Sequence, residues 1–182
     1  MHRWVLVITI VITVVMLTTP SSATQILHRS LEELGSDSQL VVQGRVTDVR
    51  SYWNEAHTKI LTETRVDVDR QFKGSGDDTI AVVQMGGVVD DVRMTVSGAL
   101  AWRPGEEVVL FLEDSLPQTY RVAGFSQGKF AVERDRNGEV FVRRPLLGVP
   151  LVNAKDADRE MRLSLDELLR RTLNIREEGG QR

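Results

Sequence analysis

The clearest pattern of apolar and polar positions in this chain is a strict alternation between residues 60 and 69. One set of alternate positions holds Ile60, Thr62, Thr64, Val66 and Val68, and the other holds Leu61, Glu63, Arg65, Asp67 and Asp69. A period of two indicates a β-strand with one buried and one solvated face. Other stretches with strand character predict further strands at 39–50, 79–85, 92–97, 129–134 and 139–143.

A different pattern marks residues 106–113. Val108, Val109, Leu110, Phe111 and Leu112 form a continuous apolar run without alternation. A strand that is apolar on both faces is typical of a central position covered on both sides. We therefore expect this strand to lie at the centre of the fold.

The first element after residue 23 has the signature of a short helix. Ser30 and Glu33 have the spacing of a capping box, Leu31 and Leu34 share one face, and Gly35 is expected to end the helix.

A second, amphipathic helix is predicted near the C-terminus. Ser164 and Glu167 again have capping-box spacing. The predicted apolar stripe consists of Leu165, Leu168, Leu169 and Leu173, and the predicted i,i+4 ion pairs are Asp166–Arg170 and Glu167–Arg171. Such a stripe needs a surface to cover, and the β-domain is the nearest one.

Together these elements predict a mainly β fold, a small antiparallel, OB-like and partly open barrel with a short N-terminal helix and an amphipathic C-terminal helix. The predicted domains are a signal peptide at 1–23, a β-barrel domain at 24–150 that closes with a connector at 145–150, and a linker with the C-terminal helix and a frayed tail at 151–182.

The segment at 1–23 resembles a secretory signal peptide. His2 and Arg3 precede an apolar run of 14 residues, and Ser21 and Ala23 fit the small-x-small cleavage pattern. The expected mature chain begins at Thr24, has 182 − 23 = 159 residues, and is exported to the periplasm or the exterior. The alternative is an uncleaved anchor, although the run is shorter than the roughly 20 residues that span a bilayer. No membrane span is expected after cleavage.

Charge and cysteine content narrow the classes of partner. The 159-residue chain has 22 basic and 26 acidic side chains, a net charge of −4, and the two signs are interspersed. Nucleic acid is therefore not an expected partner, because binding to phosphates uses clustered Lys and Arg. The chain has no cysteine, so it forms no disulfide and carries no lipid at a cleaved terminus.

Candidate catalytic chemistry is sparse. His28 and His57 are the histidines left after residue 23, and they lack a recognised metal-ligand spacing. A metal-dependent hydrolase that uses His57 with Asp90 or Asp91 is one alternative, and a calcium site at the two aspartates is another. Both aspartates follow a glycine pair and are more simply surface-turn residues. We expect no catalytic residue, no metal and no cofactor.

Aromatic side chains in predicted turns are the stronger candidates for function. Tyr52, Trp53, Trp102 and Arg103 belong to the residue types that are enriched at the centres of interfaces. The alternative is that the rings fill the two ends of the barrel. The leading hypothesis is a non-enzymatic exported module that binds a protein or an envelope component through these four residues.

Several short motifs resemble a family of exported bacterial proteins without an assigned activity. They are SLEEL at 30–34, VVQGRVTDV at 41–49, Trp53, FKG at 72–74, the glycines 86 and 87, PGEEVVLFL at 104–112 and GFSQGKF at 124–130. Some of these proteins appear as neighbours of secreted matrixin-type metalloproteases, and tissue inhibitors of metalloproteases share an OB-like barrel. The resemblance implies, as a further alternative, an inhibitor or accessory protein of a secreted metalloprotease. The cysteine-dependent mechanism of those inhibitors does not transfer to a chain without cysteine.

Overall fold

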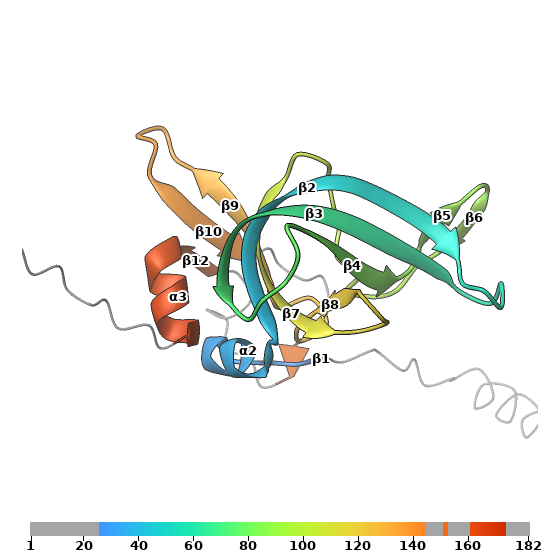
Figure 1. Ribbon diagram of the computed structural model, residues 1–182, viewed down its shortest axis with the longest axis horizontal. Helices are drawn as coiled ribbons and strands as arrows, with labels where there is room; N and C mark the ends of the chain where they lie inside the picture. Colours follow the sequence, from blue (N-terminus) through green and yellow to red (C-terminus); the bar gives the residue numbers. More distant parts are fainter. Residues whose placement is uncertain (1–25, 145–150, 153–160, 174–182) are drawn as a thin grey trace, which may run out of the picture.

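The computed structural model describes residues 26–144, 151–152 and 161–173, and Figure 1 shows the arrangement of their helices and strands. The main sheet has the strand order β12-β10-β9-β7-β2-β3-β4-β8, and its neighbours are antiparallel except for β4 and β8. Its strands are β2 (Leu40–Trp53), β3 (Ile60–Lys73), β4 (Thr79–Met85), β7 (Glu107–Asp114), β8 (Tyr120–Val122), β9 (Lys129–Arg134), β10 (Val140–Arg144) and β12 (Met161–Ser164). The prediction of a mainly β, mostly antiparallel fold is confirmed.

Part of this sheet closes into a ring of strands. β8 pairs with β7 on one side and with β4 on the other, so that the order β7-β2-β3-β4-β8 returns to β7. The contact between β4 and β8 is one residue pair, Val82 opposite Tyr120. The seam of the ring is therefore short, and the two strands separate beyond it.

β7 is covered on both faces, as its apolar run predicts. Val109 and Phe111 belong to one core and Val108, Leu110 and Leu112 to the other. The first core lies between the sheet and the two helices, whereas the second fills the ring with side chains that include Val42, Val66 and Val82. One strand thus joins both cores, and all five of these β7 side chains are fully buried.

The helix α2 (Leu31–Asp37) has the predicted capping box. The Ser30 hydroxyl accepts a hydrogen bond from the Glu33 amide, and the Glu33 carboxylate accepts one from the Ser30 amide. The prediction that Gly35 ends this helix is wrong, because the helix continues to Asp37 and Ser38 forms the C-cap. Gly35 lies instead against the backbone of Thr172, where a side chain has no room.

The helix α3 (Leu165–Leu173) packs its leucine stripe into the first core. Leu165, Leu168 and Leu169 are buried, and the Ser164 hydroxyl accepts a hydrogen bond from the Glu167 amide. Within the described residues 161–173, the predicted pairs Asp166–Arg170 and Glu167–Arg171 are not formed. Arg170 bonds Glu167 one turn earlier at i,i+3, and Arg171 reaches across to Glu32 of α2. The close packing of the two helices brings Arg171 of α3 near Glu32 of α2.

Two small pairs of strands complete the described residues. β5 (Gly87–Val89) and β6 (Val92–Met94) form a hairpin beside the far end of the long β2–β3 hairpin (Figure 1), and β1 (Ile26–Leu27) pairs in parallel with β11 (Leu151–Val152). The predicted signal peptide, the connector at 145–150 and the frayed tail lie outside the described residues. Within those residues, the two helices are too short to cross a bilayer.

Candidate functional site

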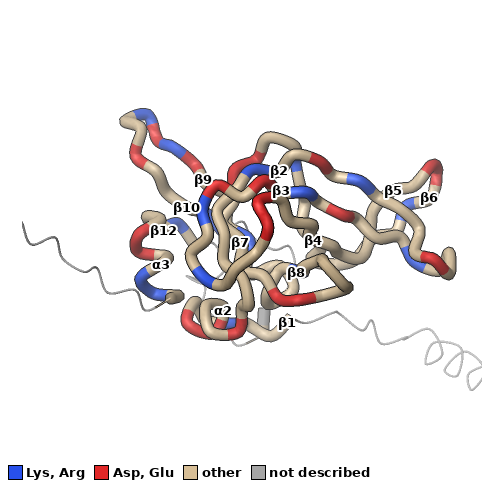
Figure 2. The backbone as a smooth tube through the Cα atoms, viewed as in Figure 1, with Lys and Arg blue, Asp and Glu red and all other residues tan. Residues whose placement is uncertain are grey.

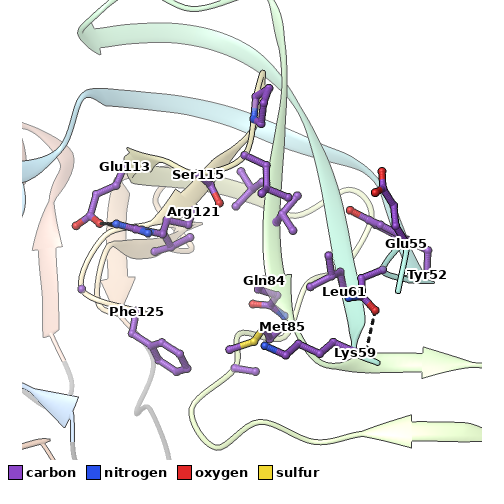
Figure 3. A pocket seen from close by; sticks show the side chains of 18 of the residues that line it. Tyr52, Glu55, Lys59, Leu61, Gln84, Met85, Glu113, Ser115, Arg121 and Phe125 are labelled. Carbon is purple, nitrogen blue, oxygen red and sulfur yellow. Dashed lines mark hydrogen bonds and ion pairs between the residues drawn. The ribbon is translucent and has the colours of Figure 1, made fainter. Parts of the chain in front are cut away.

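A groove of about 1050 Å³ opens beside the seam of the ring, between the end of the β2–β3–β4 sheet and the β7–β8 hairpin. Figure 3 shows side chains from the two sides facing the same space, with Tyr52, Leu61 and Met85 on one side and Arg121 and Phe125 on the other. Lining side chains are largely apolar, with a small number of charged groups at the rim. This composition is typical of a binding pocket.

The floor of the groove is a row of apolar side chains set by strand register. Tyr52 lies opposite Leu61 in β2 and β3, and Leu61 lies opposite Met85 in β3 and β4. Residues that are directly opposite share one face of a sheet, so the three side chains form a continuous surface. Met85 is 44 % exposed, which leaves part of this row open to solvent.

The opposite wall carries Phe125 in an unusual backbone conformation. Phe125 has φ 69° and follows Gly124 at φ 61°, so two consecutive residues adopt the left-handed region. A bulky L-residue pays roughly 1–2 kcal/mol for this conformation. Phe125 is nevertheless 46 % exposed, and Leu116 beside the same groove is 53 % exposed. The fold therefore holds an aromatic ring in the groove without burying it.

A buried glutamine fixes the backbone around this ring. Gln127 is fully buried, and its side-chain amide donates to the carbonyls of Leu27 and Gly124. Its side-chain oxygen accepts a hydrogen bond of 2.9 Å from the Arg29 amide. These bonds tie residues 124–127 to the chain that precedes α2, so the strained turn is rigidly supported.

Charged groups at this end of the groove form one connected cluster. Glu113 Oε1 accepts a hydrogen bond from Arg29, and Glu113 Oε2 accepts one from Arg121, each at 3.0 Å. Arg29 also bonds Asp37 at 3.0 Å. Both oxygens of Glu113 are therefore already paired with arginines. In Figure 3 the Glu113–Arg121 pair lies on the same side of the groove as Phe125.

The four residues predicted from sequence to form one binding surface lie in two separate places, Tyr52 and Trp53 at the end of β2 and Trp102 and Arg103 before β7. Tyr52 lines the groove, whereas Trp102 is half-buried against the core of the ring. Gly105, three residues after Trp102, donates its amide to Val46 in β2. Trp53 lies seven residues farther along that strand, which is about 20 Å at the usual rise per residue. One continuous patch of all four residues is therefore not formed.

Trp102 takes part in a buried contact with a lysine. Lys129 Nζ lies 4.4 Å from the centre of the Trp102 ring and donates to the Ala101 carbonyl and to Glu106 at 2.7 and 2.8 Å. Burial of Lys129 lowers its pKa, and the hydrogen bond from Lys129 to Glu106 opposes this effect. Arg103 is exposed in the following turn. Trp102 thus packs against the core inside the ring of strands, whereas the expectation that it fills one end of the barrel stays a prediction.

His57 and the two aspartates lie in separate turns. His57 is exposed in the β2–β3 turn with φ 52° and stacks on Trp53 at 6.1 Å between ring centres. Asp90 and Asp91 form the two-residue turn of the β5–β6 hairpin. Within the described ranges, no three His, Asp or Glu residues are grouped as a metal site.

Most residues of the groove were not predicted from the sequence. Met85, Leu116 and Arg121 lie in none of the sequence motifs, Leu61 and Phe125 lie in patterns that gave them no binding role, and the floor depends on a register across three strands. The one local signal was the glycine before Phe125, which marks a position where positive φ is common.

Figure 2 shows basic and acidic residues interspersed along the strands, which agrees with the interspersed charges of the sequence. Comparison of the chain with protein-family models and with curated proteins found no match.

Proposed function

We propose that this protein is an exported, non-enzymatic binding module, and that its binding site is the groove between Met85 and Phe125. The proposal keeps Tyr52 from the surface predicted by sequence and replaces the two tryptophans and Arg103 with the residues that line the groove. The expected partner is a protein or a component of the cell envelope.

The observation that carries this proposal is the conformation and exposure of Phe125. Backbone strain persists where the surrounding structure enforces it, and it is concentrated at ligand-binding and active sites. A half-exposed aromatic ring that costs strain and faces an apolar row is difficult to explain by stability alone. Aromatic side chains in such pockets are the usual anchors of interfaces.

Export is the second part of the proposal and rests on the sequence of residues 1–23. Intact-mass measurement of the protein recovered from the periplasm or the medium should give a chain that begins at Thr24. A product that keeps residues 1–23 in the membrane fraction would show that the segment remains as an anchor.

The binding part is tested by capture from the native envelope and the culture medium. The mature chain should retain a partner, and Phe125→Asn should lose it, because asparagine tolerates the backbone conformation but removes the ring. Val92→Ser is the matched control, since Val92 is 47 % exposed on β6 and does not line the groove. Loss of the partner from both variants, or from neither, would contradict a site in the groove.

A further inference from the structure

The groove lies where the ring of strands opens along its seam. β4 and β8 meet at Val82 and Tyr120, and β8 then pairs with β7 through Val122 and Leu112. β4 continues alone on that side to Met85, within the part of the chain that the structure describes. The groove is lined by the end of β4 on one side and by β8 on the other.

The unpaired side of β4 offers backbone hydrogen-bonding groups to the groove. The amide of Gly86 donates to Ile60 of β3, and in an antiparallel ladder successive residues direct these groups to opposite sides. The N–H and C=O of Met85 therefore point away from β3, toward the open seam. An exposed strand edge of this kind is a template for another extended chain.

The side chains around the edge favour an apolar segment. Met85 and Leu61 lie on one face of the edge, and Phe125 and Leu116 lie across the groove from them. A strand that enters the groove directs alternate side chains to one face, so every second residue of the incoming chain would meet this apolar lining.

The charges of the lining favour an acidic partner. The lining carries Arg29, Lys59 and Arg121 against Glu55 and Glu113, and Asp37, which bonds Arg29, balances the third positive charge. Glu113 is already paired with both arginines, whereas the Lys59 side chain extends beside Met85 (Figure 3). An incoming carboxylate would therefore meet the Lys59 ammonium group at this end of the groove.

We propose that the groove takes an extended polypeptide segment with alternating apolar residues and an acidic end, which adds as a strand to the free edge of β4. This inference rests on the proposed function and specifies the chemistry of its partner. Main-chain hydrogen bonds to β4 supply affinity, and the apolar row with Lys59 supplies selectivity.

Binding of synthetic octapeptides to the mature protein, measured by fluorescence anisotropy, tests the proposal. The probe alternates leucine and serine and ends in aspartate, and a second peptide ends in lysine. The aspartate peptide should bind about threefold more tightly, as expected for a solvated ion pair, and the difference should shrink in high salt. Equal binding of the two peptides would overturn the predicted preference for an acidic end.

Backbone pairing is tested by N-methylation of the same aspartate peptide, at either all leucine or all serine amides. One edge of the peptide pairs with β4, so one methylated set should bind about tenfold more weakly and the other should keep its affinity. An equal effect of the two sets would overturn strand addition.

The protein side of this pairing is tested at position 85. Met85→Pro removes the outward amide without removing a hydrogen bond to β3, and proline is tolerated on edge strands. This variant should bind the aspartate peptide about fivefold more weakly than Met85→Leu, which keeps both the amide and an apolar side chain at this position. Equal binding of the peptide by the two variants would overturn the claim that the peptide pairs with the backbone of β4 at Met85.

Two further outcomes separate this inference from the proposed function. If Phe125→Asn abolishes partner capture but no octapeptide binds, the groove is the binding site and the strand-addition inference is wrong. If the mature protein sediments as a dimer that Met85→Pro dissociates, the occupant of the edge is a second copy of this chain, and the inference is again overturned.

Discussion

Gly35 of α2 lies against the carbonyl group of Thr172 in α3, so close that a β-carbon at position 35 would lie 1.8 Å from the Thr172 oxygen. The oxygen belongs to backbone, which cannot move aside as a flexible side chain can. The two helices can pack at this distance only because residue 35 has no side chain.

Gly35→Ala should therefore destabilise the protein, although alanine is the better helix former. Overpacking of this kind typically costs about 1–3 kcal/mol. Urea unfolding should show the loss, and Ser36→Ala on the exposed side of the same helix should leave the free energy of unfolding almost unchanged. A Gly35→Ala protein as stable as the wild type would mean that the helices separate at little cost.

Leu169→Ala tests whether α3 is an integral part of the fold. Leu169 is 8 % exposed and belongs to the core between the helices and the sheet, and such truncations cost about 2–5 kcal/mol. Thermal unfolding should show a clearly lower Tm, whereas Arg170→Ala on the exposed face should have little effect. An unchanged Tm for Leu169→Ala would indicate a helix free to leave the core.

Glu107 predicts a specific dependence of stability on acid pH. The hydrogen bond from Arg134 lowers the pKa of the Glu107 carboxyl below its ordinary value of 4.5, and Gln43 donates a second bond. A lowered pKa in the folded state stabilises the protein above pH 4.5, and this contribution is lost as the pH falls through the folded-state pKa. The difference in unfolding free energy between the wild type and Glu107→Gln should therefore shrink below pH 4.5. A difference that stays constant from pH 6 to pH 3 would exclude this linkage.

Phe125→Asn tests whether the Phe125 ring stabilises the folded protein or serves binding at the expense of backbone strain. Relief of the left-handed conformation should offset the modest packing energy that a half-exposed ring contributes, so we expect a free energy of unfolding within about 1 kcal/mol of the wild type. Phe130→Ala is the contrasting variant, since Phe130 is fully buried and its truncation should cost about 3–5 kcal/mol. A loss of similar size at position 125 would make Phe125 a core residue and remove the main argument for the groove.

Periodicity was sufficient to predict the body of the fold. The alternation in β3 and the continuous apolar run of β7 each correspond to the observed burial, because side-chain direction in a strand follows directly from position. The role of Gly35 could not be predicted in this way, since it depends on Thr172, which is 137 positions away in the sequence. Local capping rules assign a helical glycine to the helix end and contain no information on a neighbouring helix.

The groove could not be predicted from the sequence either, because it also depends on residues that are far apart along the chain. Tyr52, Leu61 and Met85 become neighbours only through the register of three strands, and the opening of the seam depends on where β8 leaves β4. Trp102 was a plausible interface residue by type, but the ring is half-buried against the core and Lys129. Residue type alone does not show whether a tryptophan contacts a binding partner or packs against the protein's own core.

Amide hydrogen exchange of the mature protein, with and without the partner captured from its native envelope or medium, tests the central claim most directly. A partner in the groove should slow exchange at residues 82–86 of β4 and its end and at residues 121–126 around Phe125, while the segment around Trp102 and Arg103 keeps its exchange rate. Slower exchange around Trp102 and Arg103, with β4 and the Phe125 turn unchanged, would contradict the assignment of the groove as the binding site.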